Sequence, residues 1–288
     1  MRPVTIAAVT TALAVAPLAA QDFRLTRELA AGRAFHLENI IGDVRVTGTS
    51  GRTLEVTAVK RAGDDGDPRD VTIEAVDFEG GVAVCVRYPV RDRGRGSDNR
   101  DRGSSSPCRR DGYSGNNERN NTSVEFTVRV PAGLQLDIGT VSGDVLAERI
   151  DGDLELTSVS GNAELRTARG PRIDVTTVSG DVLLEDVTSK EVEGTTVSGD
   201  VRFQGPIEDG GNYDFTTTSG DIRITLPRRP NATLEAASFS GGLSSDLPVD
   251  RPEGRTRRHR YSATWGTGSA KLSITTLSGN LAIRVTSP

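Results

Sequence analysis

The chain has 288 residues, of which 35% are hydrophobic, 4% aromatic and 26% charged, and its formal net charge is −5. This length suffices for a sizeable core, and the slight acidic excess argues against a general nucleic-acid-binding protein. The chain contains 32 glycines. With so few aromatic residues, this indicates many tight turns around small and branched core side chains.

Residues 1–20 have the pattern of a secretory signal peptide. Arg2 is a short positive start, residues 4–16 are mostly apolar, and Leu18-Ala19-Ala20 offers a cleavage site before Gln21. No later stretch is apolar over the roughly 18 residues that a membrane helix needs. We therefore expect an exported protein, periplasmic, extracellular or at the cell surface, with no integral membrane segment after signal cleavage.

Residues 21–130 predict an irregular β region. Alternating or β-rich stretches indicate strands at 53–60, 71–76, 81–88 and 123–130. Residues 91–121 instead contain mainly Arg, Asp, Gly, Ser and Asn, which predicts a flexible loop.

The two cysteines are Cys85, in the alternating segment 81–88, and Cys108, in the polar loop. An exported chain meets oxidising conditions, which favours a Cys85–Cys108 disulfide over two free thiols. Closing that loop would stabilise the fold by about 3 kcal/mol in the chain-entropy account. Neither cysteine has a histidine nearby in sequence, which argues against a catalytic thiol.

The dominant feature of residues 131–288 is a Ser-Gly pair, usually followed by Asp or Asn, that recurs seven times. The steps between successive glycines are 18, 19, 19, 21, 21 and 38 residues. A period near 20 with β-type composition is typical of a solenoid. The glycines are Gly143, Gly161, Gly180, Gly199, Gly220, Gly241 and Gly279.

Numbering from each glycine as position 0, residues at −7, −5, +2 and +4 are mostly apolar, which predicts two short strands per coil with a corner between them. Position −3 is always Thr or Ser, so stacked coils would align their hydroxyls. We predict an all-β, parallel β-solenoid with coils of about 19–21 residues. A propeller is less compatible, because a blade needs about 40–50 residues. Residues 38–46 match the frame with Gly42 at position 0, so the irregular region contains a related coil.

The 38-residue step contains an insertion, residues 246–270, in place of a regular corner. It includes Arg257, Arg258 and Trp265, the one tryptophan of the chain. The segment reads as a solvated loop or a degenerate coil. Alternatively, basic residues beside a tryptophan suit a loop that binds an acidic protein or a glycan.

Four features together resemble the bacterial "putative adhesin" family of β-strand-repeat proteins, DUF4097: the signal peptide, residues 38–44, the Val130-Pro131-Ala132-Gly133 junction and the Thr-Val-Ser-Gly-Asp-Val copies. The resemblance covers about residues 23–285. It implies a β-solenoid-like fold and an exported location, and it supplies no catalytic residues to carry over.

The repeat would stack Asp181, Asp200 and Asp221 about 5 Å apart. Such a row could hold a calcium ion, or pair carboxylates as retaining glycosidases do. Asn162, Gly242 and Asn280 take the same position in other copies, which favours a plain corner role. The sequence shows no catalytic constellation, metal-ligand spacing or cofactor motif.

These observations favour an exported, non-enzymatic solenoid that presents a binding or adhesion surface to an envelope protein or glycan. One alternative is a polysaccharide-active enzyme, or a cation-binding solenoid, that uses the aspartate row. Another is a structural envelope protein that assembles end to end.

Overall fold

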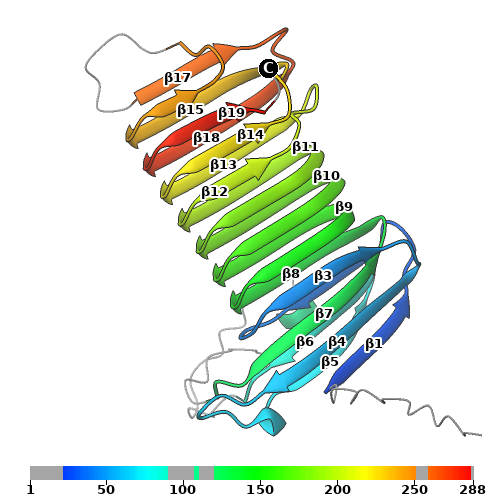
Figure 1. Cartoon of the computed structure of the whole chain (residues 1–288). Helices are drawn as coiled ribbons and strands as arrows, with labels where there is room; N and C mark the ends of the chain where they lie inside the picture. Colours follow the sequence, from blue (N-terminus) through cyan, green and yellow to red (C-terminus); the bar gives the residue numbers. More distant parts are fainter. Residues whose placement is uncertain (1–21, 90–106, 110–119, 251–258, 287–288) are drawn as a thin grey trace, which may run out of the picture.

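The computed structural model describes residues 22–89, 107–109, 120–250 and 259–286. They form an elongated stack of β-coils (Figure 1), which confirms the prediction of a mainly parallel β-solenoid. The predicted signal peptide, most of the predicted loop 91–121, and Arg257 and Arg258 lie outside the described residues. Within the described ranges, no helix has the length and apolar character needed to cross a bilayer.

Nineteen strands and two single-turn 3₁₀ segments form the described structure. They are β1 (Phe23–Glu28), β2 (Ala34–Glu38), β3 (Val44–Thr49), β4 (Thr53–Arg61), η1 (Pro68–Asp70), β5 (Thr72–Phe78), β6 (Gly81–Arg87), η2 (Pro107–Arg109), β7 (Ser123–Pro131), β8 (Leu134–Ser142), β9 (Val145–Ser160), β10 (Ala163–Ser179), β11 (Val182–Ser198), β12 (Val201–Gln204), β13 (Asn212–Ser219), β14 (Ile222–Leu226), β15 (Ala232–Ser240), β16 (Leu243–Ser245), β17 (His259–Thr264), β18 (Ala270–Ser278) and β19 (Leu281–Val285).

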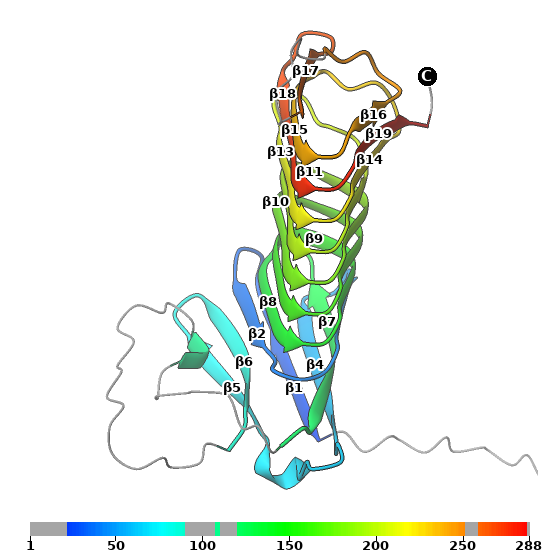
Figure 2. The same ribbon diagram turned by 90° about the vertical axis from the view of Figure 1, so that its left-hand side faces the viewer.

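Each coil contributes to two layers that face each other across the core (Figure 2). Layer I contains the strand segments that lead into a Ser-Gly corner, and layer II contains those that follow it. The long strands β9, β10 and β11 turn between the layers, with their first halves in layer II and their second halves in layer I. The coil predicted around Gly42 is present, because β2 pairs in parallel with β8, and β3 with β9.

The stack departs from chain order at its C-terminal end. In layer I, β18 lies between β13 and β15 and pairs in parallel with both. In layer II, β19 lies likewise between β14 and β16. The last coil of the chain is therefore the penultimate coil of the stack, and the β15–β16 coil is the terminal one (Figure 1).

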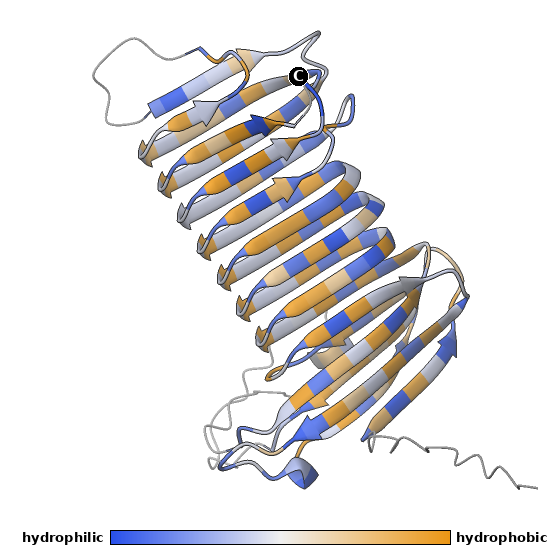
Figure 3. Cartoon of the chain, viewed as in Figure 1, coloured by the Kyte–Doolittle hydropathy of each residue, from blue (hydrophilic) through white to orange (hydrophobic). Residues whose placement is uncertain are grey.

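The core forms because inward and outward residues alternate along every coil, as the hydropathy colouring in Figure 3 shows. Phe203, Tyr213 and Phe215 are all at most 2% exposed and pack ring against ring. One repeat has no means of burying its own apolar face, so each coil depends on its neighbours.

Glycine is required at the corner by close backbone approach. Gly180 has φ +155°, and a Cβ atom there would lie 2.1 Å from the carbonyl oxygen of Gly161 on the preceding coil. The buried hydroxyl at position −3 caps the same oxygen: Thr177 Oγ1 donates to the Gly161 carbonyl at 3.0 Å. The predicted hydroxyl ladder is thus a set of bonds from each Thr or Ser to a glycine carbonyl of the adjacent coil, at 2.9–3.4 Å.

The C-terminal end of the stack is covered. Strand β17 adds to β15 in the antiparallel direction, and β16 has only three residues. A short edge strand and a reversed strand both weaken the template that a parallel stack offers to another molecule. This arrangement disfavours assembly through the C-terminal end of the stack.

Candidate functional site

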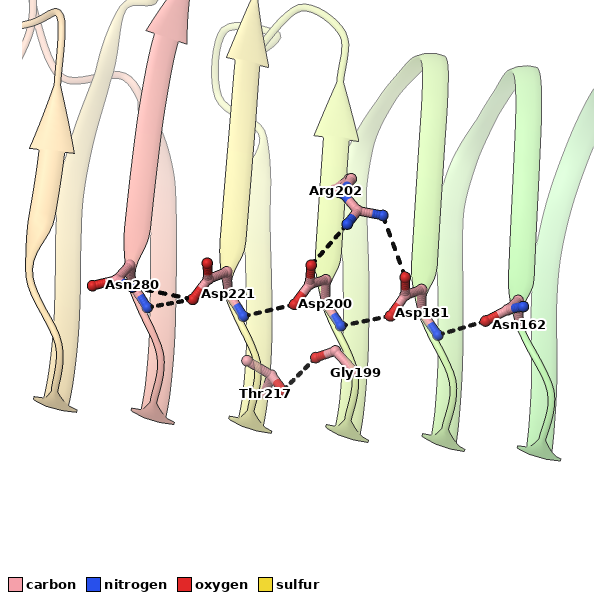
Figure 4. A network of polar contacts seen from close by, with 8 residues as sticks. All are labelled: Asn162, Asp181, Gly199, Asp200, Arg202, Thr217, Asp221 and Asn280. Carbon is pink, nitrogen blue, oxygen red and sulfur yellow. Dashed lines mark hydrogen bonds and ion pairs between the residues drawn. The ribbon is translucent and has the colours of Figure 1, made fainter.

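The predicted aspartate row is present, and its oxygens bond the backbone of neighbouring coils. Asp181 Oδ1 accepts the amide N–H of Asp200 at 2.9 Å, and Asp200 Oδ1 accepts that of Asp221 at 2.9 Å (Figure 4). The second carboxylate oxygens of Asp181 and Asp200 pair with Arg202 at 3.3 and 2.7 Å. Each aspartate therefore joins its own corner to the next one.

This role accounts for the other residue types at position +1. An asparagine oxygen accepts the same bond, as Asn162 Oδ1 does from the Asp181 N–H at 2.9 Å. Gly242, which offers no acceptor, occurs in the terminal coil, where no further coil follows in the stack. The row acts as a backbone acceptor in each of these copies, which favours a corner role over chemistry on a substrate.

We expect Asp181→Asn to retain the free energy of unfolding and Asp181→Ala to lower it by about 1 kcal/mol. Asparagine keeps the acceptor for the Asp200 amide, whereas alanine removes it. The exposed pairing with Arg202 should contribute little. Urea denaturation of both variants measures this. An equal loss in the two would mean that the carboxylate charge, not the acceptor, stabilises the corner.

Trp265 does not lie on the surface of the insertion. Its side chain is 1% exposed, and its indole N–H donates to the Pro248 carbonyl at 2.9 Å. Residues 259–264 of the insertion form β17 on the edge of β15. Trp265 thus closes the core beneath the terminal coil, which corrects the idea that it contacts a partner.

The predicted disulfide is confirmed: Cys85 and Cys108 are bonded, with a Cα–Cα distance of 5.5 Å. The bond holds η2 against β6, and the two cysteines pack with Ala83 in a small cluster apart from the main core. Cys108 also lies near His36 and Glu38, in the one potential metal-binding group found among the described residues. Its sulfur belongs to the disulfide, so the group lacks a thiolate ligand.

His36 lies buried between two carboxylates at this end of the stack. Its Nδ1 lies 2.6 Å from Asp137 and its Nε2 lies 3.0 Å from Glu38. Burial acts to lower the pKa of His36, but the hydrogen bonds to the two carboxylates outweigh burial and raise the pKa to about 9. A cleft of about 390 Å³ adjoins it, with Phe78 and Pro107 in its lining.

We expect raised pH to destabilise the fold through His36. Its pKa rises from 6.5 to about 9 on folding. Protonated His36 therefore contributes about 3 kcal/mol to the free energy of unfolding below pH 6.5. This contribution is lost as pH rises through 9. Unfolding should be measured from pH 6 to pH 10 for the native chain and for His36→Gln, which does not titrate. The difference between the two should shrink as pH rises; parallel curves would contradict this assignment.

A row of exposed apolar side chains runs along the layer I side of the corners. These side chains occupy position −2, they are 41–52% exposed, and the chain places one in nearly every coil. Strand pairing puts them in adjacent coils about 4.8 Å apart, and Thr218 interrupts the row at one coil. This apolar row consists of Val141, Val159, Val178, Val197, Leu277 and Phe239.

A column of carboxylates runs parallel to that row on the same outer face. It occupies position −6 on successive paired strands of layer I. Burial raises the pKa of Glu155, as does the charge of Asp137 and Asp174. Burial and its own acidic neighbours raise the pKa of Glu193 similarly. This acidic column consists of Asp137, Glu155, Asp174, Glu193 and Asp214.

The two outer faces differ in charge balance. On layer II, the outward positions +3 and +5 carry both signs. Glu148, Glu164 and Glu185 surround Arg166, and other coils place Arg45, Arg202, Arg223 and Arg284 there. On layer I, the basic partners found for the acidic column within the described ranges are His36 and Arg172. The layer I face therefore combines an excess of negative charge with exposed apolar area.

Sequence reasoning missed this face. The sequence predicted a binding surface on the solenoid without placing it, and it drew attention to position +1 and to the insertion. The same glycine frame contains the signal, because position −2 reads Val, Val, Val, Val, Thr, Phe, Leu and position −6 reads Asp, Glu, Asp, Glu, Asp, Glu, Ser in chain order. Outward positions of a strand are usually polar, so a series of hydrophobic residues at such a position indicates a candidate contact surface.

The family model described as Toastrack DUF4097 matches residues 136–284. The chain belongs to this Toastrack family. The match covers the repeat coils from β8 to β19, including the coil that is inserted out of order.

Two solved structures are similar at low identity. A "putative cell adhesion protein" from Clostridium sporogenes has 10% identity, with 91% of this chain and 98% of that chain covered and a TM-score of 0.33. A "putative adhesin" from Bacteroides fragilis has 12% identity, with 91% and 97% covered and a TM-score of 0.40. No curated protein matches the chain.

Proposed function

We propose that this Toastrack protein is an exported, non-enzymatic binding protein that holds a surface partner on the outer face of layer I. The observation that supports this most directly is the apolar row. Six residues at 41–52% exposure line up along the stack, with one interruption at Thr218. Single exposed apolar residues are ordinary, whereas an aligned row of them marks an interaction surface.

Two further observations support export. The N-terminal sequence has the signal pattern, with its apolar run and Leu18-Ala19-Ala20. The Cys85–Cys108 disulfide is of the kind that persists in oxidising compartments. The partner would then be an envelope protein or a glycan outside the cytoplasm.

Retention of labelled protein, residues 21–288, on immobilised bacterial envelope fractions tests the proposal. Val159→Thr, Val178→Thr and Val197→Thr combined should reduce retention by at least fivefold, because the three side chains form the middle of the apolar row. Threonine keeps the branched shape that suits a strand and already occurs at position 218.

The matched control is Leu146→Thr with Leu183→Thr. These leucines point outward on layer II, where they are half-buried. Both variants should keep the native melting temperature within a few degrees, and the control should keep full retention. Equal retention by the native chain and the valine variant would refute a binding role for this face.

A further inference from the structure

We infer that the layer I face binds a cationic amphipathic helix, with its basic side chains on the acidic column and its aliphatic side chains on the apolar row. This inference deepens the proposed function and depends on it.

The apolar row alone is too narrow to hold a partner. From Val141 to Phe239 it spans six strand-to-strand steps, about 29 Å at 4.8 Å per step. Its six side chains, each 41–52% exposed, offer roughly 450 Å² of accessible surface, well below the roughly 800 Å² per partner of a stable interface. Extension to positions −6 and −8 widens the face to about 20 Å. A stable complex must therefore cover the acidic column as well.

The charge of the column selects the partner. Burial and neighbouring carboxylates raise the pKa values of Glu155 and Glu193, and Arg172 offsets only part of this. Cations of a partner would relieve the remaining repulsion. Pairing of two copies through their layer I faces does not provide them. Such pairing would set the column against itself or against the apolar row, and both arrangements are unfavourable.

The geometry of the face matches a helix. The acidic column and the apolar row are four residues apart on each strand, about 13 Å, with position −4 between them. Position −4 is mostly threonine: Thr157, Thr176, Thr195, Thr216 and Thr275. A helix of about 10–12 Å diameter that lies along these threonines would reach both sides.

The axial spacing agrees as well. Side chains on one side of a helix recur every turn, about 5.4 Å, close to the 4.8 Å between coils. An extended strand along the same direction repeats every 6.6–6.8 Å and drifts by about 1.9 Å per coil, against about 0.6 Å for the helix. About 20 helical residues cover the 29 Å row at 1.5 Å per residue.

The test uses a synthetic 20-residue Leu/Lys amphipathic helix peptide and measures its Kd by fluorescence anisotropy at 50 mM and 500 mM salt. The protein is the disulfide-bonded chain, residues 21–288. Glu155→Gln, Asp174→Asn and Glu193→Gln combined should weaken binding about tenfold at low salt. The Val159, Val178, Val197→Thr variant should weaken it about fivefold at both salt concentrations.

Two matched controls accompany these variants. Glu148→Gln, Glu164→Gln and Glu185→Gln combined removes the same charge from layer II and should leave the Kd within twofold. A peptide with the same composition but a scrambled Leu/Lys order should bind at least tenfold more weakly to the native chain. Melting temperatures confirm that every variant is folded.

Three outcomes would overturn the inference. Equal weakening by the layer I and layer II acid variants would mean diffuse attraction to an acidic protein. Binding that appears only after residues 91–106 are deleted would assign the face to the chain's own arginine-rich segment. Absence of peptide binding while envelope retention still depends on the valines would leave the proposed function standing with a different partner. Absence of both would refute the proposed function itself.

Discussion

Gly180→Ala should destabilise the protein by more than about 3 kcal/mol, or prevent folding. The added Cβ would lie 2.1 Å from the Gly161 carbonyl oxygen, and φ is +155°. The obstacle is backbone of the adjacent coil, so the coils must separate locally, which weakens the Asp200 amide bond to Asp181. Effects of this size arise from strain at special backbone positions. Urea denaturation, or the soluble yield if the variant does not fold, measures the loss.

Gly139→Thr is the matched control. Gly139 occupies position −4 on the outside of layer I, where a Cβ would meet its nearest atom, the Leu37 carbonyl oxygen, at 3.9 Å. Other coils have threonine there, at 157, 176 and 195. The substitution should change the free energy of unfolding by no more than about 0.5 kcal/mol. Equal losses at positions 139 and 180 would show that glycine at the corner is not required for stacking.

Most of the fold could be predicted from the sequence because the contacts repeat. A glycine and a hydroxyl three residues before it recur in each Ser-Gly coil, and an acceptor one residue after it recurs in every coil but the terminal one. The hydroxyl and the acceptor bond the corner backbone of a neighbouring coil, as Thr177 and Asp181 illustrate. Alternation along the same frame assigned the core. The disulfide was predictable from the two cysteines and the expected compartment.

The order of the last coils was not predicted, and the spacing explains why. Gly241 follows Gly220 by 21 residues, and Gly220 follows Gly199 by the same step, so direct stacking of β15–β16 on β13–β14 satisfies the period. The structure places Gly279 against Gly220 instead. Position +1 contains the missing information. Asn280 accepts the Gly242 N–H at 3.4 Å, whereas Gly242 offers no acceptor to a further coil and suits the end of a stack.

The candidate site was less predictable, because a binding face differs from a solvated face only in degree. Position +1 attracted attention through its carboxylates, yet those oxygens serve the backbone, as Asp200 does for Asp221. Trp265 suggested a surface contact, yet its indole lies in the core. For the aspartates the residue types at position +1 already favoured a corner role, whereas for Trp265 residue type alone did not reveal which atoms of a neighbouring coil the side chain meets.

Phe203→Ala and Phe239→Ala should separate the requirements of stability from those of binding. Phe203, at position +4, is 2% exposed, and its ring lies 5.1 Å from Phe215 and 6.0 Å from Tyr213. Truncation to alanine leaves a cavity between the two layers. The coils on either side are closely packed, so the layers have little freedom to move in and fill it. The free energy of unfolding should fall by about 3–5 kcal/mol.

Phe239, at position −2 of the terminal coil, is 44% exposed. Its truncation creates no cavity and should cost less than about 1 kcal/mol of stability. If the apolar row binds a partner, the same substitution should reduce envelope retention, while Phe203→Ala should reduce retention only as far as it unfolds the chain. Circular dichroism measures the stability of each variant. Retention is then compared at a temperature where both variants are folded. A Phe239 variant that binds normally but unfolds readily would assign that ring to the core, and would remove the end of the row from the binding face.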